Sequence, residues 1–239
     1  MKNEFITTKN VKKFVALMAE LQNLPPNIPK MALVYGEPGL GKSETVAKWA
    51  FKNPCVYVRA KQGMTTRWLL SEIANELELE ACWHIDDTFN EIKKALANKS
   101  FTIIIDEVDY LIEKKAIETL RDLHDTTKCP LVLVGMGLID KKLSRYPHLY
   151  DRIYKKLKFE QFNSDDIREI VEKLTDFEFS EGGLEYLSRQ TNQFRELVKL
   201  IHKIEKLAKT NEIDVLDEYT LKGLLNNERT NIKALQKVG

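Results

Sequence analysis

One stretch of this 239-residue chain has the residue types and spacing that would hold a phosphate group. Glycines let a backbone curl so that successive N–H groups point at phosphate oxygens, and a following helix directs its positive end to the same place. Lys42 would supply charge to the β- and γ-phosphates, and the Ser43 hydroxyl would take a coordination position on Mg²⁺. The stretch matches G-x-x-x-x-G-K-S/T and predicts a site for ATP with Mg²⁺. Its residues are Gly36, Glu37, Pro38, Gly39, Leu40, Gly41, Lys42 and Ser43, followed by Glu44.

Two adjacent carboxylates, Asp106 and Glu107, follow the apolar run at 101–105. Ligand sites in parallel sheets lie at the carboxyl ends of the strands, so we expect this pair beside the phosphate stretch. Asp106 would hold Mg²⁺ through water, and Glu107 would orient and deprotonate the attacking water. For Asp109, the sequence favours a site role and the capping of a helix equally.

The segments that must position these residues alternate between strands and helices. Short apolar runs predict strands at 31–35, 55–58, 101–105 and 131–134. Amphipathic spacing predicts helices at 8–23, 42–51, 68–79, 88–98 and 116–125. This alternation indicates an α/β fold with a mainly parallel, doubly wound sheet.

From about residue 159 the chain reads as helix after helix. We expect these helices to start at Asn163 or Ser164, at Ser180, at Phe194 and after Asp214. The sequence therefore predicts two domains. Residues 1–158 would form the αβα nucleotide-binding domain with an additional N-terminal helix, and residues 159–239 would form a small all-helical domain.

The composition is that of an ordinary globular protein, with a net charge of +1. A nucleic-acid site would therefore have to be a local patch. Cys55, Cys82 and Cys129 have no metal-ligand spacing, and we expect them to be reduced thiols of a cytoplasmic protein. We see no signal peptide and no apolar run long enough for a membrane span, so we expect no membrane partner.

With both motifs placed, the chain resembles the AAA+ ATPases over nearly its whole length. Within them it is most similar to the phage Mu B-type and transposon-encoded transposition ATPases. The stretches that carry the resemblance are VYGEPGLGKSETV, IIIDEVDYL, VYVRAKQGMTTRWLLSEIANEL, ETLRDLHDTTKCPLVLVGMG and LSRYPHLYDRI, of which the first two are general AAA+ signatures. The resemblance implies a P-loop αβα domain, a helical lid, homo-oligomeric rings or filaments on double-stranded DNA, and a transposase partner.

The resemblance also gives roles to arginines. Arg152, or as second choice Arg145, would reach the γ-phosphate held by a neighbouring subunit and stabilise the charge that develops there. Both belong to the basic stretch 141–158, which we assign first to the subunit interface, although each arginine could simply be solvated. In the turn Thr191–Arg195, Arg195 would touch the γ-phosphate from the same subunit, as in the sensor-2 turn of the family.

Two residues depart from the family pattern. Thr191 stands where the sensor-2 turn usually has glycine, so the turn itself is expected to differ. Met136 stands near the end of the fourth predicted strand, where AAA+ proteins usually have a polar sensor-1 residue. Its thioether cannot hydrogen-bond to water or phosphate as an asparagine would. We therefore expect either slow hydrolysis or another residue in this role, with binding unaffected.

A basic segment after the second predicted strand, Arg59–Arg67, is the candidate DNA contact. It would hold phosphates without reading sequence, and in the resembled family this region lines the DNA channel. An ordinary solvated loop is the alternative. Trp68 fits the apolar phase of its helix, and we expect it to pack in the core. The predicted DNA contacts are Lys61, Thr65, Thr66 and Arg67, with Lys114 and Lys115 from a neighbouring loop.

Three functions fit these observations. The first is an ATP-switched factor that assembles on duplex DNA and recruits or activates a transposase. The second is a protein-directed machine, such as a helicase loader or a secretion-type ATPase. The third is a nucleotide-binding scaffold that barely hydrolyses ATP, which Met136 favours. The response of ATP hydrolysis to duplex DNA separates the first from the second.

Overall fold

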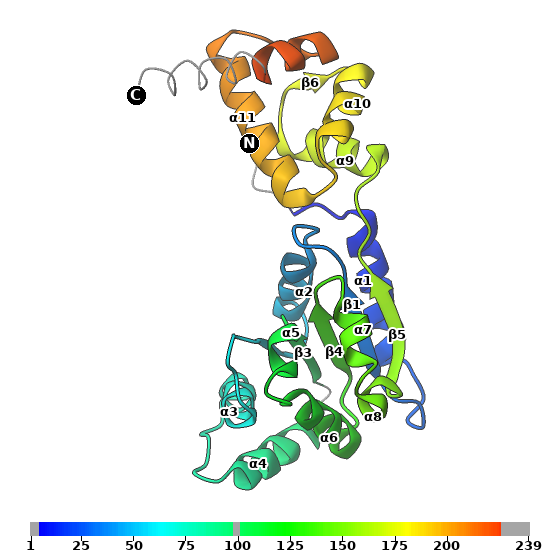
Figure 1. Ribbon diagram of the computed structural model, residues 1–239, viewed down its shortest axis with the longest axis vertical. Coiled ribbons are helices and arrows are strands. Elements are labelled where there is room, and N and C mark those ends of the chain that lie inside the picture. The colour runs from blue at the N-terminus through cyan, green and yellow to red at the C-terminus, as the bar shows by residue number, and fades with distance from the viewer. Residues whose placement is uncertain (1–4, 98–100, 226–239) are drawn as a thin grey trace. The chain divides into compact units, whose positions relative to one another are not determined.

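A computed structural model describes residues 5–97 and 101–225 (Figure 1). These residues form two compact units, one of residues 10–160 and the other of residues 5–9 and 161–225. Asn98, the last residue of the predicted helix 88–98, lies outside the described residues, as do residues 226–239 of the predicted helical domain. No helix in the described ranges has the length and apolar character needed to cross a membrane.

The larger unit is built on a five-stranded parallel sheet with the order β2-β3-β4-β1-β5. The strands are β1 (Met31–Tyr35), β2 (Cys55–Arg59), β3 (Thr102–Asp106), β4 (Leu131–Gly135) and β5 (Ile153–Lys158). The predicted α/β class with a parallel sheet is confirmed. Since the strands run in one direction, their carboxyl ends share one edge of the sheet.

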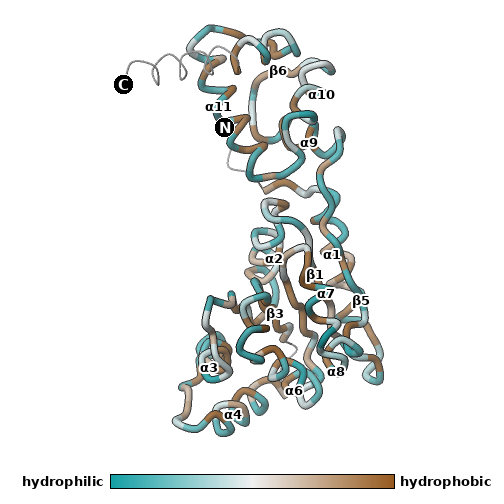
Figure 2. The backbone as a smooth tube through the Cα atoms, viewed as in Figure 1, coloured by the Kyte–Doolittle hydropathy of each residue, from teal (hydrophilic) through white to brown (hydrophobic). Residues whose placement is uncertain are grey.

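Helices cover both faces of this sheet. Ile104 of β3 packs in one core with residues of α1 (Lys9–Gln22) and α2 (Lys42–Phe51). Its neighbours Ile103 and Ile105 pack in the other core, which includes residues from the helices α3 (Thr66–Glu76), α4 (Ile85–Ala97) and α6 (Ile117–Thr127). In Figure 2 the segments labelled β1 and β3 are largely brown, the colour of hydrophobic residues. Burial on both faces explains why the central strands read as continuous apolar runs.

The edge strand β5 was not predicted. It has the sequence Ile-Tyr-Lys-Lys-Leu-Lys, and most of its side chains are exposed. Within the described residues it pairs only with β1. An edge strand that carries lysines avoids pairing with other chains and shows no apolar run. Three short helices were also missed: α5 (Asp109–Ile112), α7 (Ile139–Leu143) and α8 (Pro147–Tyr150).

The smaller unit is helical apart from one short strand pair. Its helices are α9 (Ser164–Leu174), α10 (Glu181–Gln190) and α11 (Phe194–Thr210), and residues 218–225 are also helical. The strands β6 (Glu178–Phe179) and β7 (Val215–Leu216) pair in parallel, which departs from the predicted all-helical unit. Asn163 begins α9 through a capping box with Asp166, whose backbone N–H donates to the Asn163 side chain at 2.9 Å.

Gly183→Ala should destabilise the smaller unit. A Cβ at Gly183 would lie 2.2 Å from the backbone oxygen of Leu216, so β7 would have to shift. We expect the free energy of unfolding, measured by denaturant titration, to fall by about 1–3 kcal/mol. Gly182→Ala is the matched control, because its Cβ would come no closer than 3.8 Å to another atom. That variant should gain up to about 1 kcal/mol from helix propensity. Equal losses in both variants would contradict the packing argument.

Candidate nucleotide-binding site

The phosphate stretch forms the connection between β1 and α2. Lys42 and Ser43 are the first two residues of α2, and Gly41 caps the helix with φ 82°. Gly39 has φ 80°, so both glycines adopt the left-handed conformation that other residues rarely take. The Thr45 hydroxyl donates a hydrogen bond of 2.7 Å to the Gly41 carbonyl and fixes the first turn. This strand–loop–helix context is the one that the motif requires.

The Lys42 side chain folds back onto the phosphate stretch. Its Nζ donates to the carbonyl oxygens of Gly36 at 2.7 Å and Glu37 at 2.9 Å. Burial lowers the pKa of Lys42, and the nearby carboxylates of Asp106, Glu37 and Asp109 oppose that lowering. The phosphate stretch and Asp106 are therefore within electrostatic reach of each other.

The strand order spaces the two motifs. β4 lies between β1, which leads into the phosphate stretch, and β3, which ends at Asp106. Adjacent strands are about 4.8 Å apart, so the ends of β1 and β3 are separated by roughly 10 Å. That interval leaves room for a hydrated Mg²⁺ and a terminal phosphate, and Ser43 and Asp106 would be the residues that hold the metal ion. The residues present therefore suit ATP with Mg²⁺.

Asp106 is held by hydrogen bonds from two directions and is 2% exposed. Its Oδ1 accepts the N–H of Glu107 at 2.8 Å, and its Oδ2 accepts the Tyr57 hydroxyl of β2 at 3.1 Å. Burial and the Asp106 carboxylate raise the pKa of Tyr57, so the phenol stays protonated and donates. Tyr57 was not among the predicted site residues, because its contact depends on the pairing of β2 with β3.

Glu107 forms an ion pair with Arg59 at the end of β2. The Arg59 Nε donates to the Glu107 Oε1 at 3.0 Å, and Nη2 donates to the same oxygen. This hydrogen bonding to Glu107 raises the pKa of Arg59. Arg59 pairs in register with Asp106, which brings its side chain beside Glu107. The carboxylate predicted to activate water is therefore engaged by an arginine of the neighbouring strand.

Met136 follows the end of β4, between the phosphate stretch and the acidic pair. Its side chain is 46% exposed, and its backbone N–H donates to the Asp109 Oδ2 at 2.8 Å. The Asp109 Oδ1 accepts the Lys142 ammonium at 3.0 Å. Val108 occupies the cap position of α5, so Asp109 does not cap its own helix. Its two contacts instead connect α5 to the turn after β4 and to α7.

Arg152 lies at the opposite end of the strands from the phosphate stretch. The next residue, Ile153, pairs with Met31, the first residue of β1. At about 3.3 Å per strand residue, the length of β1 keeps Arg152 more than roughly 13 Å from the phosphate stretch of its own chain. Its guanidinium forms an ion pair with Asp125 at 3.2 Å. Arg145 is exposed between α7 and α8, and its side chain makes no hydrogen bond or ion pair with another described residue.

Arg195 is exposed in the first turn of α11, in the smaller unit. The turn before it does not need glycine, because Thr191 has an extended φ of −160°. The Thr191 hydroxyl instead accepts the N–H of Gln193 at 3.3 Å. The role of Arg195 toward a nucleotide stays a prediction.

The candidate DNA segment is a shorter loop than predicted. Thr65 caps α3 by accepting the N–H of Trp68 at 3.3 Å, so Thr66 and Arg67 belong to the first helical turn. Gly63 has φ 78°, and Met64 is fully buried, which anchors the loop to the core. Lys114 and Lys115 are exposed in the turn between α5 and α6.

Two tryptophans lie beside the cations of this segment. The prediction that Trp68 packs in the core is wrong, because the apolar face of α3 is formed by its neighbours and Trp68 is 39% exposed. Its Nε1 donates to Glu72 at 2.7 Å, and the Lys61 ammonium lies 5.4 Å from its ring and 3.1 Å from Glu72. The Arg67 guanidinium donates to the Trp83 carbonyl and lies 5.8 Å from the Trp83 ring.

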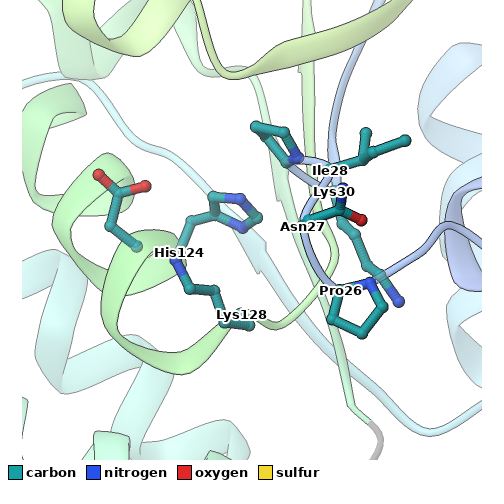
Figure 3. Close-up of a pocket in the computed structure, with 8 residues that line it drawn as sticks. Pro26, Asn27, Ile28, Lys30, His124 and Lys128 are labelled. Carbon is teal, nitrogen blue, oxygen red and sulfur yellow. The ribbon is translucent and has the colours of Figure 1, made fainter.

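A cavity of about 160 Å³ lies at the amino ends of β1 and β4. Figure 3 shows His124 and Lys128 on one side of it and the segment from Pro26 to Lys30 on the other. The His124 Nδ1 lies 2.8 Å from the Cys129 carbonyl, and burial lowers the pKa of His124, which favours the neutral ring. Because it is at the other end of the strands, this cavity is separate from the phosphate stretch.

Comparisons with known proteins agree with this geometry. Residues 29–143 match the family model described as AAA domain. The solved structure of the Aeropyrum pernix ORC2 protein matches with a TM-score of 0.68 at 15% identity, over 95% of this chain and 70% of that chain. The fold is that of the AAA+ P-loop ATPases.

Two similar proteins extend the comparison. A potential ATP-binding protein of Staphylococcus aureus is 27% identical over 88% of this chain and 91% of its own length. The ATP-dependent target DNA activator B of Escherichia phage Mu is 26% identical over 70% of this chain. The match spans 55% of the phage Mu protein. The AAA+ part of the resemblance is supported, and the phage Mu part is a distant similarity.

Proposed function

We propose that this chain is an ATPase that assembles on double-stranded DNA and recruits or activates a transposase. One observation carries the ATPase part: the phosphate stretch after β1 and the acidic pair at the end of β3 lie at the same edge of the parallel sheet, separated by one strand. A loop that carries phosphate-directed N–H groups beside a carboxylate pair suits phosphoryl transfer to water.

The residues have separate tasks in this proposal. Lys42 and the loop N–H groups bind the β- and γ-phosphates, and Ser43 and Asp106 hold Mg²⁺, which neutralises developing charge on the phosphates when bound. Glu107 orients the attacking water and accepts its proton. Arg152 acts on the nucleotide of a neighbouring subunit, since it lies at the far end of the strands from its own phosphate stretch.

Two features of the site predict slow hydrolysis by the isolated chain. Met136 offers no side-chain donor at the end of β4, and Glu107 is engaged by Arg59. Arg59 is the first residue of the basic segment proposed to contact DNA, two residues before Lys61. A DNA phosphate that attracts Arg59 would release Glu107, so duplex DNA is expected to stimulate hydrolysis.

The DNA part of the proposal is supported by two observations. The phage Mu protein that this chain resembles is described as a target DNA activator. Lys61 and Arg67 flank the start of α3, whose free N–H groups favour an anion. Both cations already have partners within the chain, so each subunit is expected to bind DNA weakly and an ATP-dependent assembly to bind it well.

Lys42→Ala and Glu107→Gln should have different effects. The first removes the charge directed at the phosphates, so nucleotide binding should be lost. The second removes only the proton acceptor, so ATP should bind while hydrolysis falls by about 100-fold or more. Equilibrium binding of a fluorescent ATP analogue and phosphate release under saturating ATP measure the two effects. Hydrolysis at the original rate by Glu107→Gln would refute the role of the acidic pair.

Arg59→Ala should raise hydrolysis in the absence of DNA by several-fold, because Glu107 is then released from its ion pair. The same variant should respond less to duplex DNA. Arg121→Ala is the matched control, since it breaks a comparable surface ion pair with Asp122 away from the acidic pair. A decrease in DNA-free hydrolysis on removal of Arg59 would show that the ion pair does not restrain Glu107.

Changing Lys61 and Arg67 together to Ala should weaken binding to duplex DNA. Each lost phosphate contact should reduce the slope of a plot of log binding constant against log salt concentration by about 0.9. The measurement is a DNA titration at several salt concentrations, with a non-hydrolysable ATP analogue, ADP or neither. Arg168→Ala with Lys173→Ala on α9 removes the same charge elsewhere and is the control. No duplex binding at low salt with the analogue would favour the protein-directed machine.

A further inference from the structure

Asp125 contacts the guanidinium of Arg152 with both of its carboxylate oxygens. The Arg152 Nε donates to Oδ1 at 3.4 Å, and Nη2 donates to Oδ2 at 3.2 Å. The remaining terminal nitrogen, Nη1, lies 3.7 Å from the Asp151 carboxylate, which is too long for a hydrogen bond. One edge of the guanidinium is therefore bound by Asp125, and the Nη1 edge is open to a further acceptor.

Asp125 itself is held by a fixed part of the fold. It lies near the end of α6, directly after Leu123 and His124, which are both buried. The His124 ring is bonded to the Cys129 carbonyl, and the Thr127 hydroxyl donates to the Leu123 carbonyl at 2.7 Å. Because the neighbours of Asp125 are packed and bonded, its carboxylate has a defined position from which to orient another side chain.

The arrangement distinguishes Arg152 from Arg145. An arginine side chain has several rotatable bonds, and contacts to both oxygens of one carboxylate fix the plane of its guanidinium. Arg145 has no such partner among the described residues. An arginine that must meet a phosphate on another molecule gains from this fixed orientation, because misplacement by about 1 Å can cost a hundredfold in rate.

We propose that Asp125 is a positioning residue that orients Arg152 toward the γ-phosphate held by a neighbouring subunit. This inference rests on the proposed function, in which Arg152 acts in trans. Asp125 does not touch the nucleotide. Its effect is confined to the subunit that supplies the arginine, and a residue needed only for folding would affect both subunits.

The test uses two full-length chains that are each inactive. The Arg152→Ala chain binds ATP but supplies no arginine, and the Lys42→Ala chain supplies Arg152 but binds no ATP. Their mixture should hydrolyse ATP, since some interfaces combine an intact phosphate site with an intact arginine. Asp125→Ala is then added either to the Lys42→Ala chain or to the Arg152→Ala chain.

Asp125→Ala in the arginine-supplying Lys42→Ala chain should lower activity of the mixture by about 10- to 100-fold. The same change in the Arg152→Ala chain should leave activity of the mixture within about twofold. The affinity of Asp125→Ala for a fluorescent ATP analogue should match that of the unchanged chain, which reports on folding independently of hydrolysis.

Three outcomes would overturn the inference. Equal losses in both placements would make Asp125 a folding residue, and an unchanged or higher activity with Asp125→Ala in the arginine-supplying chain would show that it does not orient Arg152. If the parent mixture is no more active than its components, trans action itself is wrong. That last result is separable from the others because it appears before Asp125 is changed.

Discussion

The position of β4 between β1 and β3 is the constraint on which the site depends. It sets the interval between the phosphate stretch and Asp106, and that interval is the width needed for a metal ion and a terminal phosphate. The interval is rigid because β1, β3 and β4 are buried on both faces. It also means that the residue after β4 lies between the two motifs. In this chain that residue is Met136, so the fold offers the room for hydrolysis but not the usual polar group.

Three charged groups proposed to act in hydrolysis have partners within the chain. Lys42 is bonded to loop carbonyls, Glu107 to Arg59, and Arg152 to Asp125. The partly exposed pair of Arg59 with Glu107 contributes at most about 1 kcal/mol, so a phosphate can draw Arg59 away at little cost. Asp125 can instead stay bound to Arg152, because it leaves the Nη1 edge of the guanidinium open to a phosphate. A bound nucleotide would therefore draw Lys42 away from the loop carbonyls, and DNA would draw Arg59 away from Glu107.

The parts of the site that were predictable are local in sequence. The phosphate stretch and the acidic pair each follow an apolar strand that is buried on both faces. Both motifs can therefore be recognised in the sequence without knowing the order of the strands. What could not be predicted depends on pairing between distant segments. Arg59 meets Glu107 only through the register of β2 with β3, and Arg152 meets Asp125 only where β5 begins beside α6. β5 was missed because an edge strand of lysines has no apolar run, and Trp68 was misplaced because the helix turns it away from its buried neighbours.

The two ends of the strands also restrict how subunits would associate. The phosphate stretch lies at the carboxyl ends, and Arg152 lies at the amino ends. A twofold symmetric dimer joins the same patch of both subunits, so it would not bring an arginine at one end to a phosphate at the other. If Arg152 acts in trans, subunits must contact head to tail, with the amino-end face of one against the carboxyl-end face of the next. Such contacts would repeat until they close into a ring or continue as a filament, and either form would line up many of the proposed weak DNA contacts along one duplex.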